Sequence, residues 1–393
     1  MNAHIHKILL TRDNLYICEN GAIVTFGWFS TPYSSCSGGS WKLVAAERQA
    51  SGAAAYDAFL KSALTINVQD PANTYPDINS VWSTFEVKLG AIGSLLSYEP
   101  VMRDFIQLGY QEMLQDKVQY MEIRTVLPDG VCRSLDNCDS PLSAMELAAL
   151  YKEVTDEFTA SNPTFCGVSM IYAPVRRVDE TTVQSYLDTA QQLMNAFPGF
   201  FVGFDLVGQE DLGRPLIDFA DEIIAASTSN PNLNFYFHAA ETNWQGQETD
   251  INVIDALLLG TKRIGHGYGI AKHPEAKRLA LENDVPVEVN PISNQVLGLV
   301  HDLRNHPAAI LIQEGFPVVI SSDDPGAWDA YGLSWDFYEA FMGLASRDMD
   351  LRLLKQLTFG SIRYSALDAS RKDDCLARVQ LEWDIYMQLQ RSL

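Results

Sequence analysis

The sequence lacks several features, and each absence excludes a class of function. It has no run of about 20 consecutive apolar residues, the length that a membrane-spanning helix needs. Basic residues are few, because 28 Lys and Arg stand against 50 Asp and Glu and give a formal net charge of -22. Such an acidic surface repels phosphate backbones and anionic lipids. We therefore expect neither nucleic acid nor a membrane as a partner.

Cysteine is also scarce, with six residues and no CxxC pair, so a thioredoxin-like motif or a zinc ribbon is not indicated. Four cysteines fall in polar, turn-rich stretches: Cys18, Cys36, Cys132 and Cys138. We predict a Cys18–Cys36 disulfide and consider a Cys132–Cys138 disulfide, which favours a secreted, extracellular protein; six reduced cytosolic thiols are the alternative. Cys166, in an apolar run, is interpreted as a buried strand thiol, and Cys375 stays unassigned.

Short apolar runs alternate with helix-period segments from about residue 115 onward. The predicted strands are Val118–Val126, Phe165–Tyr172, Phe200–Val207, Leu233–Ala239, Arg263–Gly267, Val285–Val289 and Phe316–Ser321. The fragment Ala3–His6 supplies an eighth strand. Eight strand–helix units predict an α/β fold, a (β/α)₈ TIM-type barrel.

Residues 12–75 do not follow this rhythm. They are rich in Ser, Gly, Ala and aromatic residues, and they contain Cys18 and Cys36. We expect them to form a small inserted subdomain after the first strand, within a single barrel that spans residues 1–393.

Polar residues that bind metals or move protons follow the predicted strands at their carboxyl ends, where barrel active sites are built. His4 and His6 share one face of the first strand, because strand side chains alternate with a period of two. His238 and Asp323 follow two further strands. Three imidazoles and one carboxylate suit Zn²⁺ with an open position for water. The sequence therefore predicts one zinc ion per chain.

Three further residues at strand ends could use that water in a reaction, by moving protons or by contacting substrate. Glu241 lies three positions after His238 and is free to donate a proton. His266 stands between two glycines and would orient or deprotonate the water. Asp324 adjoins Asp323 and points in a different direction, so it can meet substrate; a plain turn is the alternative for this Asp-Asp-Pro sequence.

These motifs resemble the adenosine deaminase family. HxH, His-Ala-x-Glu, Gly-His-Gly and Ser-Ser-Asp-Asp-Pro occur in the family's order. Four longer strings are similar to its secreted branch, the adenosine deaminase-related growth factors: residues 118–124, 203–208, 291–297 and 303–307. The insertion with Cys18 and Cys36 also resembles the disulfide-bearing insertion of that branch.

The resemblance implies a role for each site residue. Zinc would be held by His4, His6, His238 and Asp323. Glu241 would protonate N1 of the purine, His266 would serve the attacking water, Asp324 would meet N7, and the backbone of Gly208 would meet N3. Lys7, Trp82 and Glu122 complete the predicted substrate contacts.

The sequence departs from the family at three places. Ala240 stands where the family has Gly, and Lys7 follows His6 where members carry an Asp for the ribose 5′-hydroxyl. The amino-terminal helices that pair subunits in the branch are missing, so we expect any homodimer to be weakened.

We predict hydrolytic deamination of adenosine and 2′-deoxyadenosine. The nearest alternative is the same reaction on adenosine 5′-monophosphate, with Lys7 as the phosphate contact. A second alternative is a growth-factor-like binding protein that has lost catalysis. Both predicted deaminase activities act on a small-molecule partner, a purine nucleoside or nucleotide.

Overall fold

The computed structural model describes residues 12–32, 35–135 and 138–392. A parallel sheet lies at its centre, made of β4 (Tyr120–Thr125), β5 (Gly167–Tyr172), β6 (Phe201–Phe204), β7 (His238–Ala239), β8 (Ile264–His266), β9 (Val287–Val289) and β10 (Val318–Ile320). β4 to β6 form one ladder and β7 to β10 another, joined by a parallel bridge between Phe204 and Phe235. The predicted barrel fold is confirmed; its predicted first strand, at residues 3–6, lies outside the described residues.

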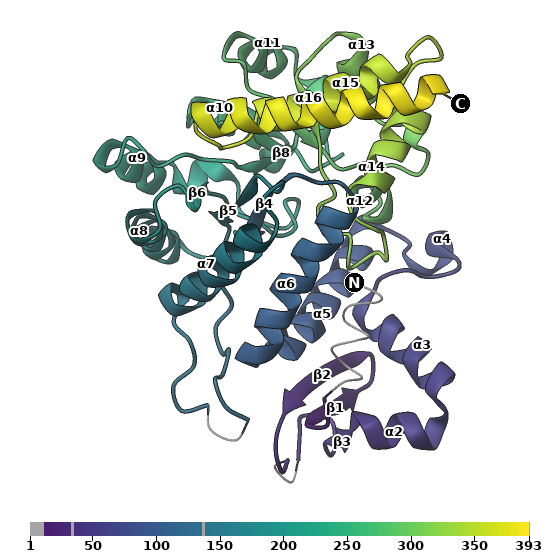
Figure 1. Cartoon of the computed structure of the whole chain (residues 1–393). Helices are drawn as coiled ribbons and strands as arrows, with labels where there is room; N and C mark the ends of the chain where they lie inside the picture. Colours follow the sequence, from purple (N-terminus) through teal and green to yellow (C-terminus); the bar gives the residue numbers. More distant parts are fainter. Residues whose placement is uncertain (1–11, 33–34, 136–137, 393) are drawn as a thin grey trace.

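Helices follow the strands and surround the sheet (Figure 1). They are α7 (Ala144–Ser161), α8 (Glu180–Ala196), α9 (Ala220–Ser229), α10 (Asn252–Leu258), α11 (Pro274–Glu282), α12 (Pro291–Val296), α13 (Ala308–Gln313), α14 (Ser334–Glu339) and α15 (Leu351–Arg363). The long helix α16 (Ala369–Ser392) packs against α15. This order is the alternation that a barrel requires.

Local sequence explains where these elements begin and which are buried. Ser143 and Glu146 form a capping box that starts α7, and Asp179 accepts the backbone N–H of Thr182 to start α8. Every residue of β5 is buried, as expected for a parallel strand with both faces covered.

The described residues of the predicted insertion form a three-stranded antiparallel sheet, two strands of which make a hairpin, and three helices. The strands are β1 (Leu15–Asn20), β2 (Ile23–Trp28) and β3 (Lys42–Leu43), followed by α2 (Val44–Ser51), α3 (Ala53–Leu64) and α4 (Pro71–Thr74). Two further helices, α5 (Ile78–Leu95) and α6 (Glu99–Gln115), lead into the barrel. The hairpin docks on α5, because Phe26 donates its N–H to Ser94 Oγ at 2.9 Å and Trp28 Nε1 donates to Leu95 O at 2.8 Å.

All six cysteines are paired. The structure contains the two disulfides that the sequence suggested, Cys18–Cys36 and Cys132–Cys138. It also joins Cys166 to Cys375, with their Cα atoms 5.9 Å apart. The interpretation of Cys166 as a free buried thiol is therefore wrong. The apolar run around Cys166 did indicate burial, but its partner lies 209 residues later on α16, and only the fold brings them together.

We expect the Cys166–Cys375 disulfide to contribute strongly to stability. A cross-link that closes a long loop restricts the unfolded chain most, so replacing both cysteines with Ala should lower the free energy of unfolding by about 2–5 kcal/mol. Calorimetric melting of the double variant measures this loss. The matched control is the Cys132→Ala and Cys138→Ala pair, whose loop spans only 6 residues and whose loss should be smaller. An equal or larger loss from the short loop would contradict the prediction.

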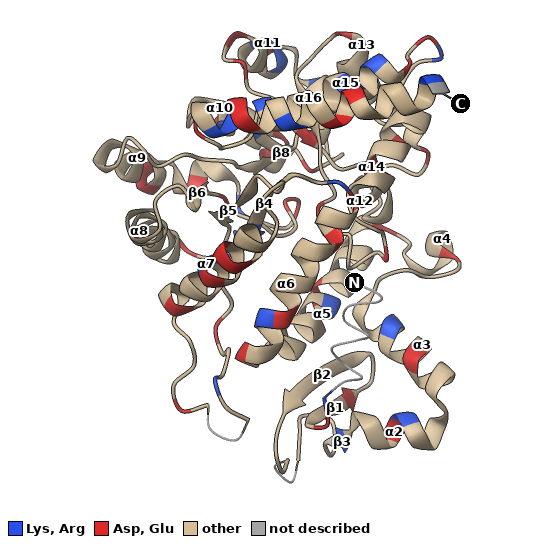
Figure 2. Ribbon diagram, in the orientation of Figure 1, with Lys and Arg blue, Asp and Glu red and all other residues tan. Residues whose placement is uncertain are grey.

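The surface agrees with the acidic composition. Both signs are spread over the helices in the view of Figure 2, and on α7 the acidic residues predominate. No helix within the described part of the chain is long and apolar enough to cross a membrane.

Candidate active site

Glu241, His266 and Asp323 converge at the carboxyl ends of β7, β8 and β10. One ligand atom from each lies within 4.8 Å of the others. His266 Nδ1 is 3.4 Å from Glu241 Oε1, and His266 Nε2 is 3.8 Å from Asp323 Oδ2. The parallel strands place their ends at one edge, so residues up to 82 positions apart in sequence meet there. The structure thus brings three of the predicted site residues together.

His238 lies beside this cluster, with its ring centroid 4.9 Å from that of His266. Its Nδ1 is 2.5 Å from Asp205 Oδ2, and its backbone N–H donates to Asp205 Oδ1 at 2.8 Å. This carboxylate fixes the ring and leaves Nε2 as the nitrogen available to a ligand. Asp205 is a residue of this candidate site that the sequence interpretation did not single out. Its position after an apolar strand was a usable sign, because such strand ends meet at the site.

A series of alternating charges continues from Asp205 into the barrel. Arg124 Nε lies 2.7 Å from Asp205 Oδ2, and Arg124 Nη1 lies 2.8 Å from Glu288 Oε2. Arg263 pairs with both Glu288, at 2.7 Å, and Glu122. Burial alone would raise the pKa of Glu288, but Arg124 and Arg263 hold it well below its usual range. These five residues form the charge column.

Glu122 belongs to the charge column, and the structure does not bring it to the cluster. One of its oxygens pairs with Arg263, and the other accepts the backbone N–H of Ala366 at 2.5 Å. Both oxygens are therefore engaged at the barrel interior. A substrate contact through Glu122 would require breaking one of these interactions.

Three residues at the site adopt left-handed backbone conformations that are unfavourable for residues other than glycine. They are Ala240, His266 and Asp323, with φ of 60°, 59° and 54°. Such strain concentrates at functional sites, where the surroundings hold the chain in place. Glycine would adopt this backbone conformation without strain. The Ala240 methyl is fully buried, and it would lie 3.2 Å from a Cβ built on Gly269.

Glu241 is almost fully buried, with 4% of its surface exposed. Its Oε1 has no hydrogen-bond partner among the described residues. Burial raises the pKa of this carboxyl well above its usual range, and the nearby Asp323 and Glu210 carboxylates add to the shift. Glu241 is therefore suited to hold a proton at neutral pH and to deliver it to a bound molecule.

His266 is oriented by a chain of hydrogen bonds. Ala308 donates its N–H to His306 Nδ1 at 3.0 Å, so the His306 proton lies on Nε2, 2.9 Å from Asn294 Oδ1. The Asn294 and Asn290 amides then lie 3.2 and 3.1 Å from His266 Nδ1. Because Nδ1 accepts, the proton of the neutral ring sits on Nε2. Burial lowers the pKa of His266 to about 3 and keeps the ring neutral.

The remaining predicted residues lie in different places. Asp324 is exposed next to Asp323. Gly208 has a φ of 99°, with no described atom within 4 Å of the position of a Cβ, so its backbone is open to approach. Trp82, on α5, is buried and packs edge-on against Phe85 in a cluster that also contains Trp328. His4, His6 and Lys7 lie outside the described residues.

The donor set fits a divalent metal ion. Asp323 Oδ2 is held by Ser293 Oγ at 2.6 Å, and His238 is held by Asp205, so both ligands are oriented by neighbours. Glu241 Oε1, which is buried and has no hydrogen-bond partner within the described part of the chain, lies beside them. Imidazole and carboxylate are ligands that zinc prefers.

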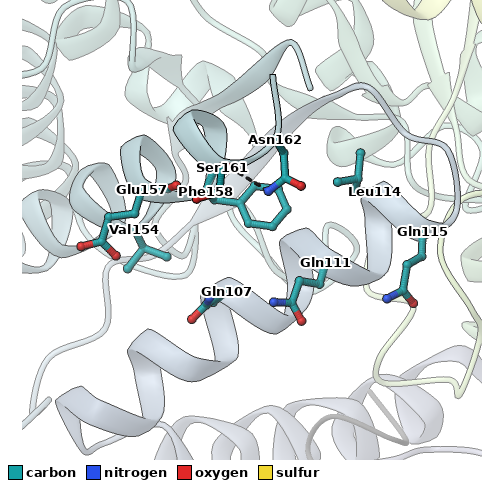
Figure 3. Close-up of a pocket in the computed structure, with 9 residues that line it drawn as sticks. All are labelled: Gln107, Gln111, Leu114, Gln115, Val154, Glu157, Phe158, Ser161 and Asn162. Carbon is teal, nitrogen blue, oxygen red and sulfur yellow. Dashed lines mark hydrogen bonds between the residues drawn. The ribbon is translucent and has the colours of Figure 1, made fainter. Parts of the chain in front are cut away.

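A separate groove of about 430 Å³ lies between α6 and α7 (Figure 3). It is lined by Gln107, Gln111, Leu114, Gln115, Val154, Glu157, Phe158, Ser161 and Asn162. The groove shares no residue with the cluster and contains no histidine. The candidate active site is the cluster at the strand ends, and the groove is separate from it.

Comparison with known proteins identifies the family. Residues 56–382 match the sequence model of the adenosine deaminase family. The chain is 47% identical over 345 residues to an adenosine deaminase of Lutzomyia longipalpis, covering 88% of this chain and 66% of that protein. It is 40% identical over 390 residues to adenosine deaminase 2-A of Danio rerio, covering 97% of this chain and 76% of that one. The chain thus spans about two thirds to three quarters of these relatives.

Solved structures share the fold at low identity. An Arabidopsis N6-mAMP deaminase superimposes with a TM-score of 0.64 and 18% identity, covering 84% of this chain and 90% of that one. A Burkholderia ambifaria amidohydrolase with bound zinc gives a TM-score of 0.64 and 18% identity, covering 81% and 85%.

Proposed function

The chain belongs to the adenosine deaminase family, in its growth-factor-related branch, and on this premise we propose that it hydrolyses adenosine and 2′-deoxyadenosine to inosine and 2′-deoxyinosine with release of ammonia. The observation that carries the proposal is the buried Glu241 carboxyl. One of its oxygens has no hydrogen-bond partner among the residues that the structure describes, and the carboxyl faces His266 and the Asp323 side of the cluster. A carboxyl kept protonated there matches the acid that a purine ring needs during attack at C6.

Zinc is the metal that these residues suit. His238 and Asp323, with His4 and His6 from the sequence, would hold one ion per chain. When bound, the ion would lower the pKa of a coordinated water to about 7 and so make a nucleophile available at neutral pH.

The protein's own residues then account for the proton movements. The attacking water loses one proton as its oxygen bonds to C6, and Glu241 gives its proton to N1. The proton lost by the water is passed to the amino nitrogen, so the bond from C6 to that nitrogen breaks and ammonia leaves. The remaining hydroxyl proton returns to Glu241 as the C6 carbonyl forms. His266, with its proton on Nε2, would orient the water. Asp324 would bind N7, the open backbone of Gly208 would bind N3, and Trp82 would flank the substrate. The balance is one water consumed and one ammonia released.

One experiment tests the proposal. Ammonia release is measured side by side for adenosine, 2′-deoxyadenosine and adenosine 5′-monophosphate. Turnover of the two nucleosides supports the proposed function. A protein that binds zinc and releases no ammonia from any of the three would instead be a growth-factor-like binding protein.

The nucleotide is the second candidate substrate, and Lys7 is the observation that favours it. A Lys offers three donors and a positive charge where a carboxylate would repel phosphate. If it meets a 5′-phosphate, the contact should be worth about 1.5–3 kcal/mol, or roughly 10- to 150-fold in selectivity.

Lys7→Asp should therefore lower kcat/KM for adenosine 5′-monophosphate by roughly 10- to 150-fold and leave adenosine unchanged or improved. Steady-state kinetics with both substrates measure the difference. An equal change for both would show that Lys7 is an ordinary surface charge, and the nucleotide candidate would lose its support.

The cellular setting is a further part of the proposal. Three disulfides in one chain suit an oxidising compartment, so we assign the protein to the extracellular space. Mass mapping under non-reducing conditions tests this assignment, since free thiols at Cys18 and Cys36 in the native protein would contradict it.

A further inference from the structure

Glu210 is a buried carboxylate next to the site that no step of the proposed reaction uses. It is 1% exposed. Its Oε1 accepts the backbone N–H of Ala240 at 2.9 Å, and its Oε2 accepts the backbone N–H of Glu241 at 2.6 Å. Asn252 Nδ2 also donates to Oε1, at 2.7 Å. One side chain therefore binds two successive backbone groups, including that of the proposed acid.

Glu210 is itself held by surrounding elements. Asn252 stands at the start of α10 and accepts the N–H of Leu216 through its Oδ1 at 2.8 Å. Arg176, also 1% exposed, places its Nη1 3.9 Å from Glu210 Oε1. The same Arg176 donates to the backbone carbonyl of His238 at 2.8 Å. Arg176 and Glu210 thus bind the backbone before and after the turn that separates His238 from Glu241.

That turn needs outside support. Ala240 has a φ of 60°, a strained conformation for alanine, and the chain reverses there between a proposed zinc ligand and the proposed acid. Buried N–H groups at such a turn have no strand partner and must be satisfied by a side chain. Glu210 satisfies two of them and fixes the direction in which the Glu241 side chain leaves the backbone.

We propose that Glu210 is a positioning residue that acts through Glu241, aiming its carboxyl at the ring nitrogen that is protonated. The inference rests on the proposed function and adds to it a residue outside the substrate contacts. Arg176 and Asn252 keep Glu210 in place.

The test is Glu210→Gln, which keeps the size of the side chain. An amide has only one oxygen, so its NH₂ group would face the N–H of Ala240 or Glu241, and the turn would shift. A displacement of about 1 Å at a reacting group costs on the order of 100-fold in rate, so we expect kcat for adenosine to fall about 10- to 100-fold. KM should change by no more than a few-fold, because the substrate contacts remain.

Asp116→Ala is the matched control. Asp116 also accepts two successive backbone N–H groups, those of Leu333 and Ser334 at 2.6 and 2.8 Å, but at the start of α14. Its loss should lower the melting temperature and leave kcat within about two-fold. A comparable fall in kcat for both variants would reduce the Glu210 effect to general destabilisation and overturn the proposal.

A double-mutant cycle separates positioning from structure. In the Glu241→Gln background the acid is already absent, so adding Glu210→Gln should lower kcat little further. A purely structural role would give the same factor in both backgrounds and would contradict the proposal. If Glu210→Gln fails to fold, Glu210→Asp keeps the charge but is one methylene shorter, and the same non-additivity is expected of it.

Failure of the positioning role and failure of the proposed function would give different results. A parent protein that releases no ammonia from any purine overturns both inferences. An active parent whose Glu210 variants keep the parental kcat overturns only the positioning role.

Discussion

Exchanging Glu241 for Gln is expected to leave the protein folded with its metal bound and to lower kcat for adenosine by about 10²–10⁴-fold. The amide has nearly the same shape but cannot donate an acidic proton to N1. The parent carboxyl can, because burial raises its pKa well above the usual range. Ammonia release measures the rate, and zinc content per chain measures the site.

Glu248→Gln is the matched control for this substitution. Glu248 lies seven residues further along the chain and is exposed, so its amide should leave kcat unchanged. A Glu241→Gln protein within a few-fold of the parental rate would mean that another group supplies the proton. Loss of zinc in that variant would mean that Glu241 is a metal ligand, as its place in the three-residue cluster would also permit.

Removing the metal should have the second large effect. We expect a strong chelator to abolish activity and added Zn²⁺ to restore it, and His238→Ala to lose most activity because one ligand is gone. The Asp205 carboxylate that orients His238 would also be left buried beside Arg124 without its ring partner. Zinc content and ammonia release, measured on the same samples, test the two effects together.

His301→Ala provides the control, since His301 is exposed and outside the cluster. It should retain both zinc and activity. Full activity in metal-free protein would refute the proposed mechanism, whereas a His238→Ala protein with parental zinc content would remove only the assignment of that ligand.

The sequence predicted the order of the barrel strands better than their lengths. The run Leu233–Ala239 predicts a full strand, but the ladder contains only His238 and Ala239, with Phe235 adding a single bridge. An apolar run shows that a segment is buried, and it does not show how many of its residues pair in register. Asp323 was easier to place, because it follows a strand closely and the ends of parallel strands meet at one edge of the barrel.

The sequence did not reveal ion pairs and hydrogen bonds between residues that lie far apart along the chain. The charge column joins residues from β4, β9 and the ends of β6 and β8, and no local pattern relates them. From the sequence, Glu210 is an ordinary acidic residue after a turn. In the structure it is buried and accepts the backbone N–H of Glu241. Such roles arise when loops from separate strands meet, which spacing along one chain does not encode.

The Cys166–Cys375 disulfide has a consequence for the order of events during synthesis. At 5–20 residues per second, Cys375 emerges roughly 10–40 s after Cys166, because 209 positions separate them. The shorter pairs, Cys18–Cys36 and Cys132–Cys138, are complete before Cys375 appears. In an oxidising compartment Cys166 therefore stays without its partner until Cys375 has been synthesised. Correct pairing requires either that the partly folded barrel shields it or that an isomerase corrects its errors after the last helix arrives.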